Sequence, residues 1–142
     1  MARNKLSPVS KQDFEPEQID YTEQEFGPFL RAVRAAKKVS LRDFETMVNK
    51  TRAYLSDIEL GNSNPPDKEL LDTMIQQLQL DSYPRIVNKL YDLAAIGRKT
   101  VSSDIKDWLM EDDNRRELIR LCRDKEFGKE QIEKLIKYAE EL

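Results

Sequence analysis

Apolar residues recur along the chain every three to four positions, the spacing of amphipathic α-helices. In the first clear segment, Phe26, Leu30 and Val33 fall on one helical face. The same period continues to the C-terminus, and no stretch alternates as a half-buried strand would. The pattern predicts an all-α fold of roughly seven or eight short helices. Their expected ranges are 26–38, 41–48, 52–60, 67–80, 82–97, 102–111, 113–127 and 129–142.

Polar residues at the boundaries predict where several helices begin and end. Ser40, Thr51 and Asp67 each precede an apolar-periodic segment and are expected to be N-caps. Asn49 stands where the chain must turn between two helices, and asparagine tolerates the left-handed conformation. Gly61 is the expected stop of the helix over 52–60. Further start signals are a Thr22–Glu25 capping box or Pro28 for the first helix, Ser82 with Pro84, and Asn114 with Glu117.

The same pattern divides the chain into three parts. Residues 1–21 show no sustained period and contain two prolines, so we expect a mobile tail with at most a docked patch. Residues 22–82 are expected to form one helical domain that contains a helix-turn-helix. Residues 83–142 form a C-terminal helical region.

Two of the predicted helices, 41–48 and 52–60, have the dimensions of a helix-turn-helix. In that motif the first helix braces across the DNA backbone, and the second enters the major groove with its N-terminus leading. The residues of the leading turn, 51–54, are not expected to pack in the core. Leu55 and Ile58 are expected to be buried and to anchor the helix. This turn also carries the positive end of the helix dipole, which suits phosphates and acceptor-rich base edges. Such geometry also occurs as plain helix packing, so spacing alone leaves both interpretations open.

Charge is distributed unevenly along the 142 residues, whose net charge is −3. Between residues 26 and 61 there are seven Lys and Arg residues against four Asp and Glu residues, a net of +3. Residues 1–25 carry −3. The acidity therefore lies outside the helix-turn-helix segment, which supports a nucleic-acid partner for that segment.

Composition argues against several other classes. The chain has no histidine and one cysteine, Cys122, whose apolar neighbours predict a buried reduced thiol. No glycine-rich phosphate loop or metal-ligand cluster is found, so we expect neither an enzyme nor a cofactor. No apolar run approaches the ~18 residues of a membrane span, and no signal-peptide segment is recognisable. We expect no membrane partner and a cytoplasmic location.

Residues 24–82 resemble the phage-repressor and Cro type of helix-turn-helix domain, the XRE family. The resemblance rests on "LRAVRAAKK" in the first helix, "SLRDF" opening the second, "YLSDIELG" in the third, and a closing "LQL". It implies a five-helix repressor-like DNA-binding domain in a sequence-specific transcriptional regulator. The later segment "LYDLAAIG" and the helices after it resemble tails of bacterial and prophage regulators.

The resemblance also implies roles for individual residues. Arg34 and Glu59 match a buried ion pair between the first helix and the recognition helix. Arg52, Ala53 and Asp57 match the base-reading positions, where they would contact guanine, a thymine methyl and cytosine N4. The implied backbone or mixed contacts are Arg42, Lys50, Thr51, Tyr54, Ser56, Asn62, Ser63 and Asn64. Two alternatives stay open: Asp57 as a rim residue that repels phosphates, and Tyr54 as a partly core-packed residue.

Glu45 departs from the family pattern, which usually has alanine where the two helices of the motif cross. Its side chain must turn to solvent or find a partner such as Lys50 or Arg52. If it takes Arg52, base reading by that arginine is affected.

Together these features predict a repressor that binds a pseudo-palindromic, double-stranded DNA operator as a homodimer, because one recognition helix offers few base contacts. The C-terminal region is the expected dimer or effector-sensing part, or it packs back on the DNA-binding unit. Its apolar residues include Trp108, Leu109, Leu118, Leu121, Leu135 and Ile136. The alternative is an antitoxin-like or adaptor module with a protein partner on these helices and secondary or no DNA binding.

Overall fold

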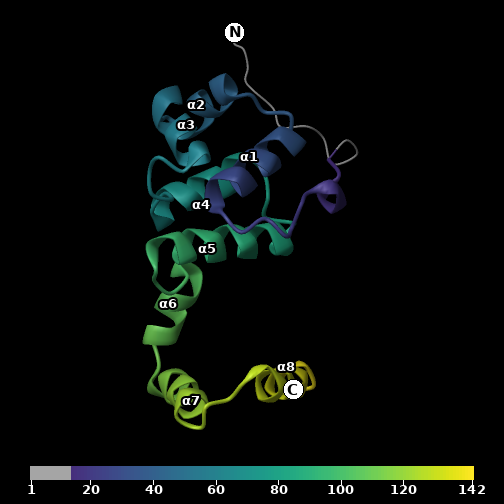
Figure 1. Cartoon of the computed structure of the whole chain (residues 1–142), viewed down its shortest axis with the longest axis vertical. Coiled ribbons are helices and arrows are strands. Elements are labelled where there is room, and N and C mark those ends of the chain that lie inside the picture. The colour runs from purple at the N-terminus through teal and green to yellow at the C-terminus, as the bar shows by residue number, and fades with distance from the viewer. Residues whose placement is uncertain (1–13) are drawn as a thin grey trace. The chain divides into compact units, whose positions relative to one another are not determined.

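A computed structural model describes residues 14–142 and shows only helices in that range, which confirms the predicted all-α class (Figure 1). The described helices are η1 (Pro16–Gln18), α1 (Phe26–Ala36), α2 (Leu41–Val48), α3 (Arg52–Leu60), α4 (Lys68–Gln77), α5 (Pro84–Arg98), α6 (Ser103–Met110), α7 (Asp113–Asp124) and α8 (Lys129–Glu140). The chain divides into two compact units, Met1–Asp104 and Ile105–Leu142. No described helix is long and apolar enough to cross a membrane.

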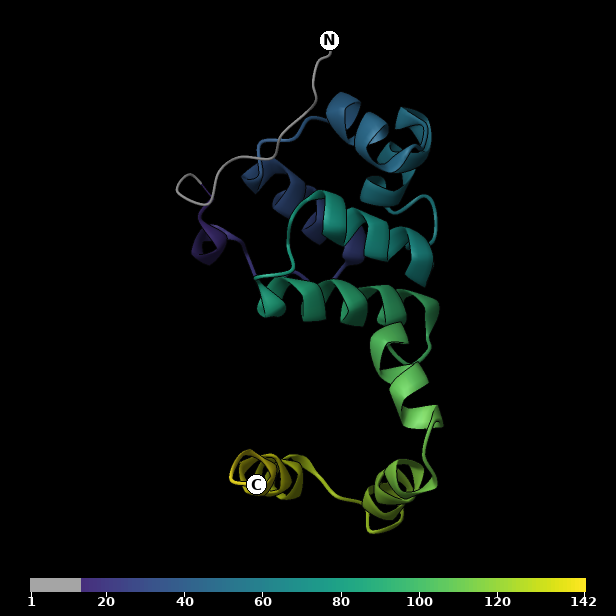
Figure 2. The same cartoon turned by 180° about the vertical axis from the view of Figure 1, so that it is seen from behind.

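Helix α1 lies at the centre of the first unit. Its Phe29, Leu30 and Val33 side chains are wholly shielded from solvent. The helix contacts α3 and α5, while α2 contacts α3 and α4. Figures 1 and 2 show α1 and α4 between the α2–α3 pair and α5. This arrangement fixes the α2–α3 pair on one side of a continuous apolar core.

Helix α5 belongs to the same core, although it lies beyond residue 82. Ile86 and Leu90 are fully buried, and Leu93 is nearly so. The compact unit therefore continues to Asp104. Five helices, α1–α5, share one core, which is compatible with the predicted five-helix domain.

The segment before α1 packs on this unit from Phe14 onward, while residues 1–13 of the predicted tail lie outside the described residues. Phe14 and Ile19 are buried, and the Phe14 ring meets Tyr83 edge-on at a centroid distance of 4.9 Å. Beneath it, the Lys37 ammonium lies 4.1 Å from the centre of the Phe14 ring, and Lys37 is only 2% exposed. The Phe14 ring thus lies between the end of α1 and the start of α5. Together with the Tyr83 ring, 5.2 Å from the Lys37 ammonium, it shields the charge of Lys37.

Three predicted caps are confirmed, and each satisfies an N–H group that a helix start leaves without a partner. The side chains of Ser40, Thr51 and Asp67 accept hydrogen bonds from backbone N–H groups three residues on, at 2.9–3.1 Å. Asn49 adopts the predicted left-handed conformation, with φ of 56°. Residues next to the two short helices therefore determine where each helix begins and where the chain turns between them.

Three other predicted caps, at Thr22, Ser82 and Asn114, are wrong. The Thr22 hydroxyl bonds to Asp20, and α1 begins after Glu25 without a side-chain cap. Tyr83 precedes Pro84 at the start of α5, again with no side-chain cap. Asp112 caps α7, since its carboxylate accepts from the backbone N–H of Asn114 at 2.7 Å. In the first case Asp20 engages the Thr22 hydroxyl away from the helix start, and in the third Asp112 takes the capping position expected for Asn114.

The second unit has no buried residue among its helical side chains. Cys122 is partly exposed, which corrects the prediction of a buried thiol. The large apolar side chains exposed here are Ile105, Trp108, Met110, Leu118, Ile119, Leu121, Ile132, Ile136, Tyr138 and Leu142. A helical unit of this size with no interior gains little from the hydrophobic effect by itself.

Candidate nucleic-acid interface

A tight turn joins α2 to α3 and sets the angle of the second helix. Asn49 is left-handed, and the N–H of Lys50 bonds back to the Glu45 carbonyl at 3.3 Å. Thr51 then caps α3 by accepting from the Tyr54 N–H at 3.1 Å. Because both ends of the turn are hydrogen-bonded, the leading residues of α3 are held in a defined position.

Helix α3 has an inner and an outer face. Leu55 and Ile58 are buried against the core. The three predicted base-reading residues, Arg52, Ala53 and Asp57, are all exposed on the opposite side. The structure therefore brings these three side chains together on one accessible surface of α3.

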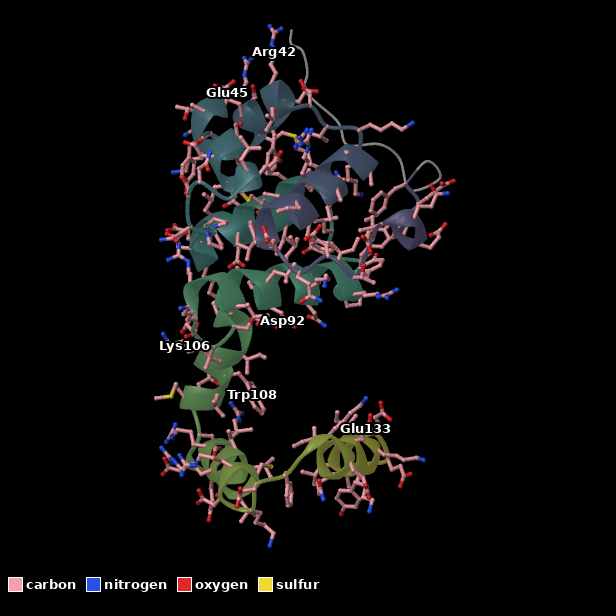
Figure 3. The ribbon with its side chains drawn as sticks, in the orientation of Figure 1. Arg42, Glu45, Asp92, Lys106, Trp108 and Glu133 are labelled. Carbon is pink, nitrogen blue, oxygen red and sulfur yellow. The ribbon has the colours of Figure 1, made fainter. Side chains whose placement is uncertain are left out.

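The residues predicted to contact the DNA backbone lie around this surface with different exposures. Those that are exposed are Arg42, Lys50, Thr51, Asn62 and Asn64, and those that are partly buried are Tyr54, Ser56 and Ser63. Figure 3 shows the Arg42 side chain pointing away from the core, and Glu45 on the same helix. The body of Tyr54 packs against the apolar core, in keeping with the partial core role left open for it.

The loop after α3 is held by backbone hydrogen bonds to the helix itself. Gly61 takes a φ of +82°, which glycine adopts without strain. The Asp57 carbonyl accepts from the N–H groups of Asn62 at 2.8 Å and Ser63 at 3.2 Å. The loop therefore starts at a fixed place beside the outer face of α3.

Arg34 and Glu59 form a buried, two-pronged ion pair that joins α1 to α3. Arg34 Nε donates to Glu59 Oε2 at 2.7 Å, and Nη2 donates to Oε1 at 2.9 Å. Nη1 of the same guanidinium donates to the Val39 carbonyl at 2.7 Å. The side chains are 11% and 4% exposed, so neither charge faces a partner on the surface. Arg34 is thus part of the scaffold that orients α3.

Gly27 is a further scaffold residue, which the sequence patterns did not single out. A Cβ atom built at Gly27 would lie 2.4 Å from the Ile58 carbonyl oxygen and 2.5 Å from that of Glu59. The first turn of α1 therefore touches the backbone of the last turn of α3. A glycine within a predicted helix was the available signal, because an interior glycine often marks a close approach of two backbones.

Glu45 contacts Arg52, one of the two partners considered for it. Its Oε2 atom accepts a hydrogen bond from the Arg52 backbone N–H at 3.2 Å. Its Oε1 atom lies 3.7 Å from Arg52 Nη2, so the two charges also form an ion pair. The side chains of Arg52 and Glu45 remain 59% and 37% exposed.

Two side chains of α5, Tyr91 and Asp92, have shifted pKa values and lie away from this surface. The pKa of Tyr91 is raised above its ordinary range, mainly by burial and to a smaller extent by a hydrogen bond to Asp72. The pKa of Asp92 is also raised, mainly because burial disfavours the charged carboxylate, and repulsion from Asp104 adds to the effect. Across residues 14–142, no group of three or more acidic or cysteine side chains is placed to hold a metal ion.

Comparison with known protein families gives a match over part of the chain. Residues 30–82, which include α2, α3 and the turn between them, match the model of the Helix-turn-helix family. That family is the phage-repressor and Cro type, a DNA-binding regulatory domain and not an enzyme family. No curated protein and no solved structure matches the chain.

Proposed function

We propose that this chain, which carries a phage-repressor and Cro-type helix-turn-helix domain over residues 30–82, is a transcriptional repressor that binds its operator as a homodimer. It would act on double-stranded DNA in the cytoplasm, with a pseudo-palindromic site read by two copies of α3.

The observation that carries the proposal is the outer face of α3. Arg52 and Ala53, in the leading turn capped by Thr51, are exposed there together with Asp57. Arginine recognises guanine O6 and N7, alanine packs on a thymine methyl, and a carboxylate accepts from cytosine N4. The buried pair of Arg34 and Glu59 supports this role, because it holds α3 without using any outward-facing side chain.

The test is selection of bound duplexes from a random-sequence pool at two salt concentrations. A repressor should enrich one sequence, and its affinity should fall as salt rises, since phosphate contacts release counterions. Absence of both enrichment and salt dependence would refute the proposal.

Two variants of the full chain separate base reading from backbone contact. Arg52→Ala should relax the preference at one base pair by about 1–3 kcal/mol. Arg42→Ala should weaken binding to all sequences alike and reduce the salt slope by about one. If both variants bind like the parent protein, the reading surface lies elsewhere.

The second unit supports homodimer formation, because its apolar side chains have no cover within that unit. Leu118 and Ile136, on α7 and α8, are both about half exposed (53% each). We propose that a second copy covers them. Light scattering on the full chain tests this: Leu118→Glu and Ile136→Glu should give monomers, whereas Lys137→Glu, on the charged side of α8, should not. Unchanged dimers in both glutamate variants would exclude this surface.

The same exposed apolar surface is the specific observation that favours an antitoxin-like or adaptor role. In that case a different protein would cover α7 and α8, and DNA binding would be secondary or lost. A full chain that is monomeric and enriches no DNA sequence would support this second candidate over the repressor.

A further inference from the structure

We infer that Glu45 is a positioning residue for base recognition: it holds the start of α3 and orients the Arg52 guanidinium toward the DNA. The inference rests on the proposed DNA-binding function and deepens it. It explains why a carboxylate can stand beside the reading surface without blocking it.

The first part of the argument is the backbone contact. Glu45 Oε2 accepts from the N–H of Arg52, the first residue of α3, at 3.2 Å. Thr51 satisfies the N–H of Tyr54, two residues further on. The first turn of α3 is therefore capped twice, once by its own N-cap and once by α2. A carboxylate here also faces the positive end of the α3 dipole, where negative charge is stabilising.

The second part is the side-chain contact. Glu45 Oε1 lies 3.7 Å from Arg52 Nη2, beyond hydrogen-bond distance but within an ion pair. Among the residues that the structure describes, no acceptor engages the guanidinium by a hydrogen bond. An arginine offers five N–H donors in a planar fork. Attraction through Nη2 therefore restricts the orientation of the fork while its donors stay available for a base.

Relative magnitudes decide between orientation and blockage. Exposed ion pairs change an equilibrium constant by up to about fivefold. A good bidentate contact between arginine and guanine discriminates by about five- to 150-fold. Since Arg52 is 59% exposed and Glu45 is 37% exposed, their attraction is in the weaker class and cannot keep Arg52 from guanine. What it does is reduce the number of side-chain orientations that must be given up on binding.

The experiment uses the full chain, the duplex enriched from the random pool, and its single-base variants. Glu45→Gln keeps an oxygen that can accept from the Arg52 N–H but removes the charge that attracts the guanidinium. We expect its preference at the base pair read by Arg52 to fall about two- to fivefold, the range of an exposed ion pair. In an Arg52→Ala background, Glu45→Gln should leave the preference at every base pair unchanged.

Asp43→Asn is the matched control. It also removes one negative charge from α2, and among residues 14–142 the Asp43 side chain makes no hydrogen bond, while its backbone N–H donates to the Ser40 hydroxyl. We expect it to raise affinity for all duplexes alike, with base preference unchanged, because it only lessens repulsion of phosphates. Thermal unfolding of all variants is measured alongside, to separate changes in helix stability from changes in base preference.

Three outcomes overturn the inference. Glu45→Gln could leave the preference unchanged, or sharpen it, which would mean that the ion pair competes with the base. Its effect could instead survive in the Arg52→Ala background, which would place Glu45 itself in contact with DNA. Failure of the proposed function looks different, since then no duplex is enriched at all or Arg52→Ala changes no base preference.

Discussion

Replacing Glu59 by glutamine should cost far more stability than its conservative shape suggests. The substitution leaves the Arg34 guanidinium only 11% exposed and without its charged partner. Two hydrogen bonds, at 2.7 and 2.9 Å, lose their carboxylate acceptor, and the glutamine amide group would face other donors. Breaking a buried pair from one side typically costs about 3–5 kcal/mol, a large part of the roughly 5–15 kcal/mol that stabilises a domain.

Urea unfolding followed by far-ultraviolet circular dichroism measures this loss. With a slope of about 2 kcal/mol per molar urea, the midpoint should fall by about 2 M. The matched control is Glu45→Gln, the same chemical change, which breaks a 3.7 Å ion pair with Arg52 between side chains that are 37% and 59% exposed. Exposed pairs contribute about 0–1 kcal/mol, so the control midpoint should fall by less than about 0.5 M. Equal shifts in the two variants would refute the argument that burial makes the Arg34–Glu59 pair important.

Three further predictions concern the scaffold of α3 and the titration of α5. Gly27→Ala should destabilise the protein by at least about 1 kcal/mol, because its Cβ would overlap two carbonyl oxygens of α3. Gly128→Ala is the control: its Cβ would lie 3.6 Å from its nearest neighbour, so no such loss of stability is expected. Thr51→Ala should cost about 1 kcal/mol in urea unfolding and Thr51→Ser much less, since serine keeps the cap. The pKa of Asp92 is raised, so the charged carboxylate is disfavoured in the folded state. The folded protein therefore loses stability as the pH rises above the pKa that Asp92 has in the unfolded chain. Asp92→Asn should therefore raise the melting temperature at neutral pH and leave it unchanged in acid, where the group is protonated in both states; an equal gain at both pH values would contradict the pKa argument.

The motif itself was predictable because its signals are local. Ser40 and Thr51 cap the helices that follow them, and Asn49 takes the left-handed turn between them. Each of these features depends on the few residues around it, which is what a sequence pattern records. The all-α class was confirmed for the same reason, since the helical period appears in every segment.

What local patterns could not supply was long-range packing. Helix α5 has the same period as the helices after it, yet Ile86 and Leu90 are buried in the first unit. Nothing near Phe14 in the sequence indicates that it covers Lys37 on α1. Contacts of this kind join residues far apart in the chain, so they follow from the shape of the assembled core and not from any window of sequence.

The site was predictable in its scaffold and less so in its details. The pairing of Arg34 with Glu59 was expected from the family resemblance, and the structure contains it. The partner of Glu45 was left open between Lys50, Arg52 and solvent, because all three lie within reach of a flexible side chain. Its contact with Arg52 depends on the crossing of α2 and α3, which sequence spacing does not define. The base-reading assignments stay predictions until a bound sequence is known.

The location of the one tryptophan gives the second unit an optical signal of its own. Trp108 belongs to the second unit, where it is 54% exposed and the Arg115 guanidinium lies 4.3 Å from its ring. Intrinsic fluorescence excited at the tryptophan band therefore reports on that unit, while circular dichroism sums the helices of both. A fluorescence change when DNA is added would show that the second unit responds to DNA, readable without any attached dye.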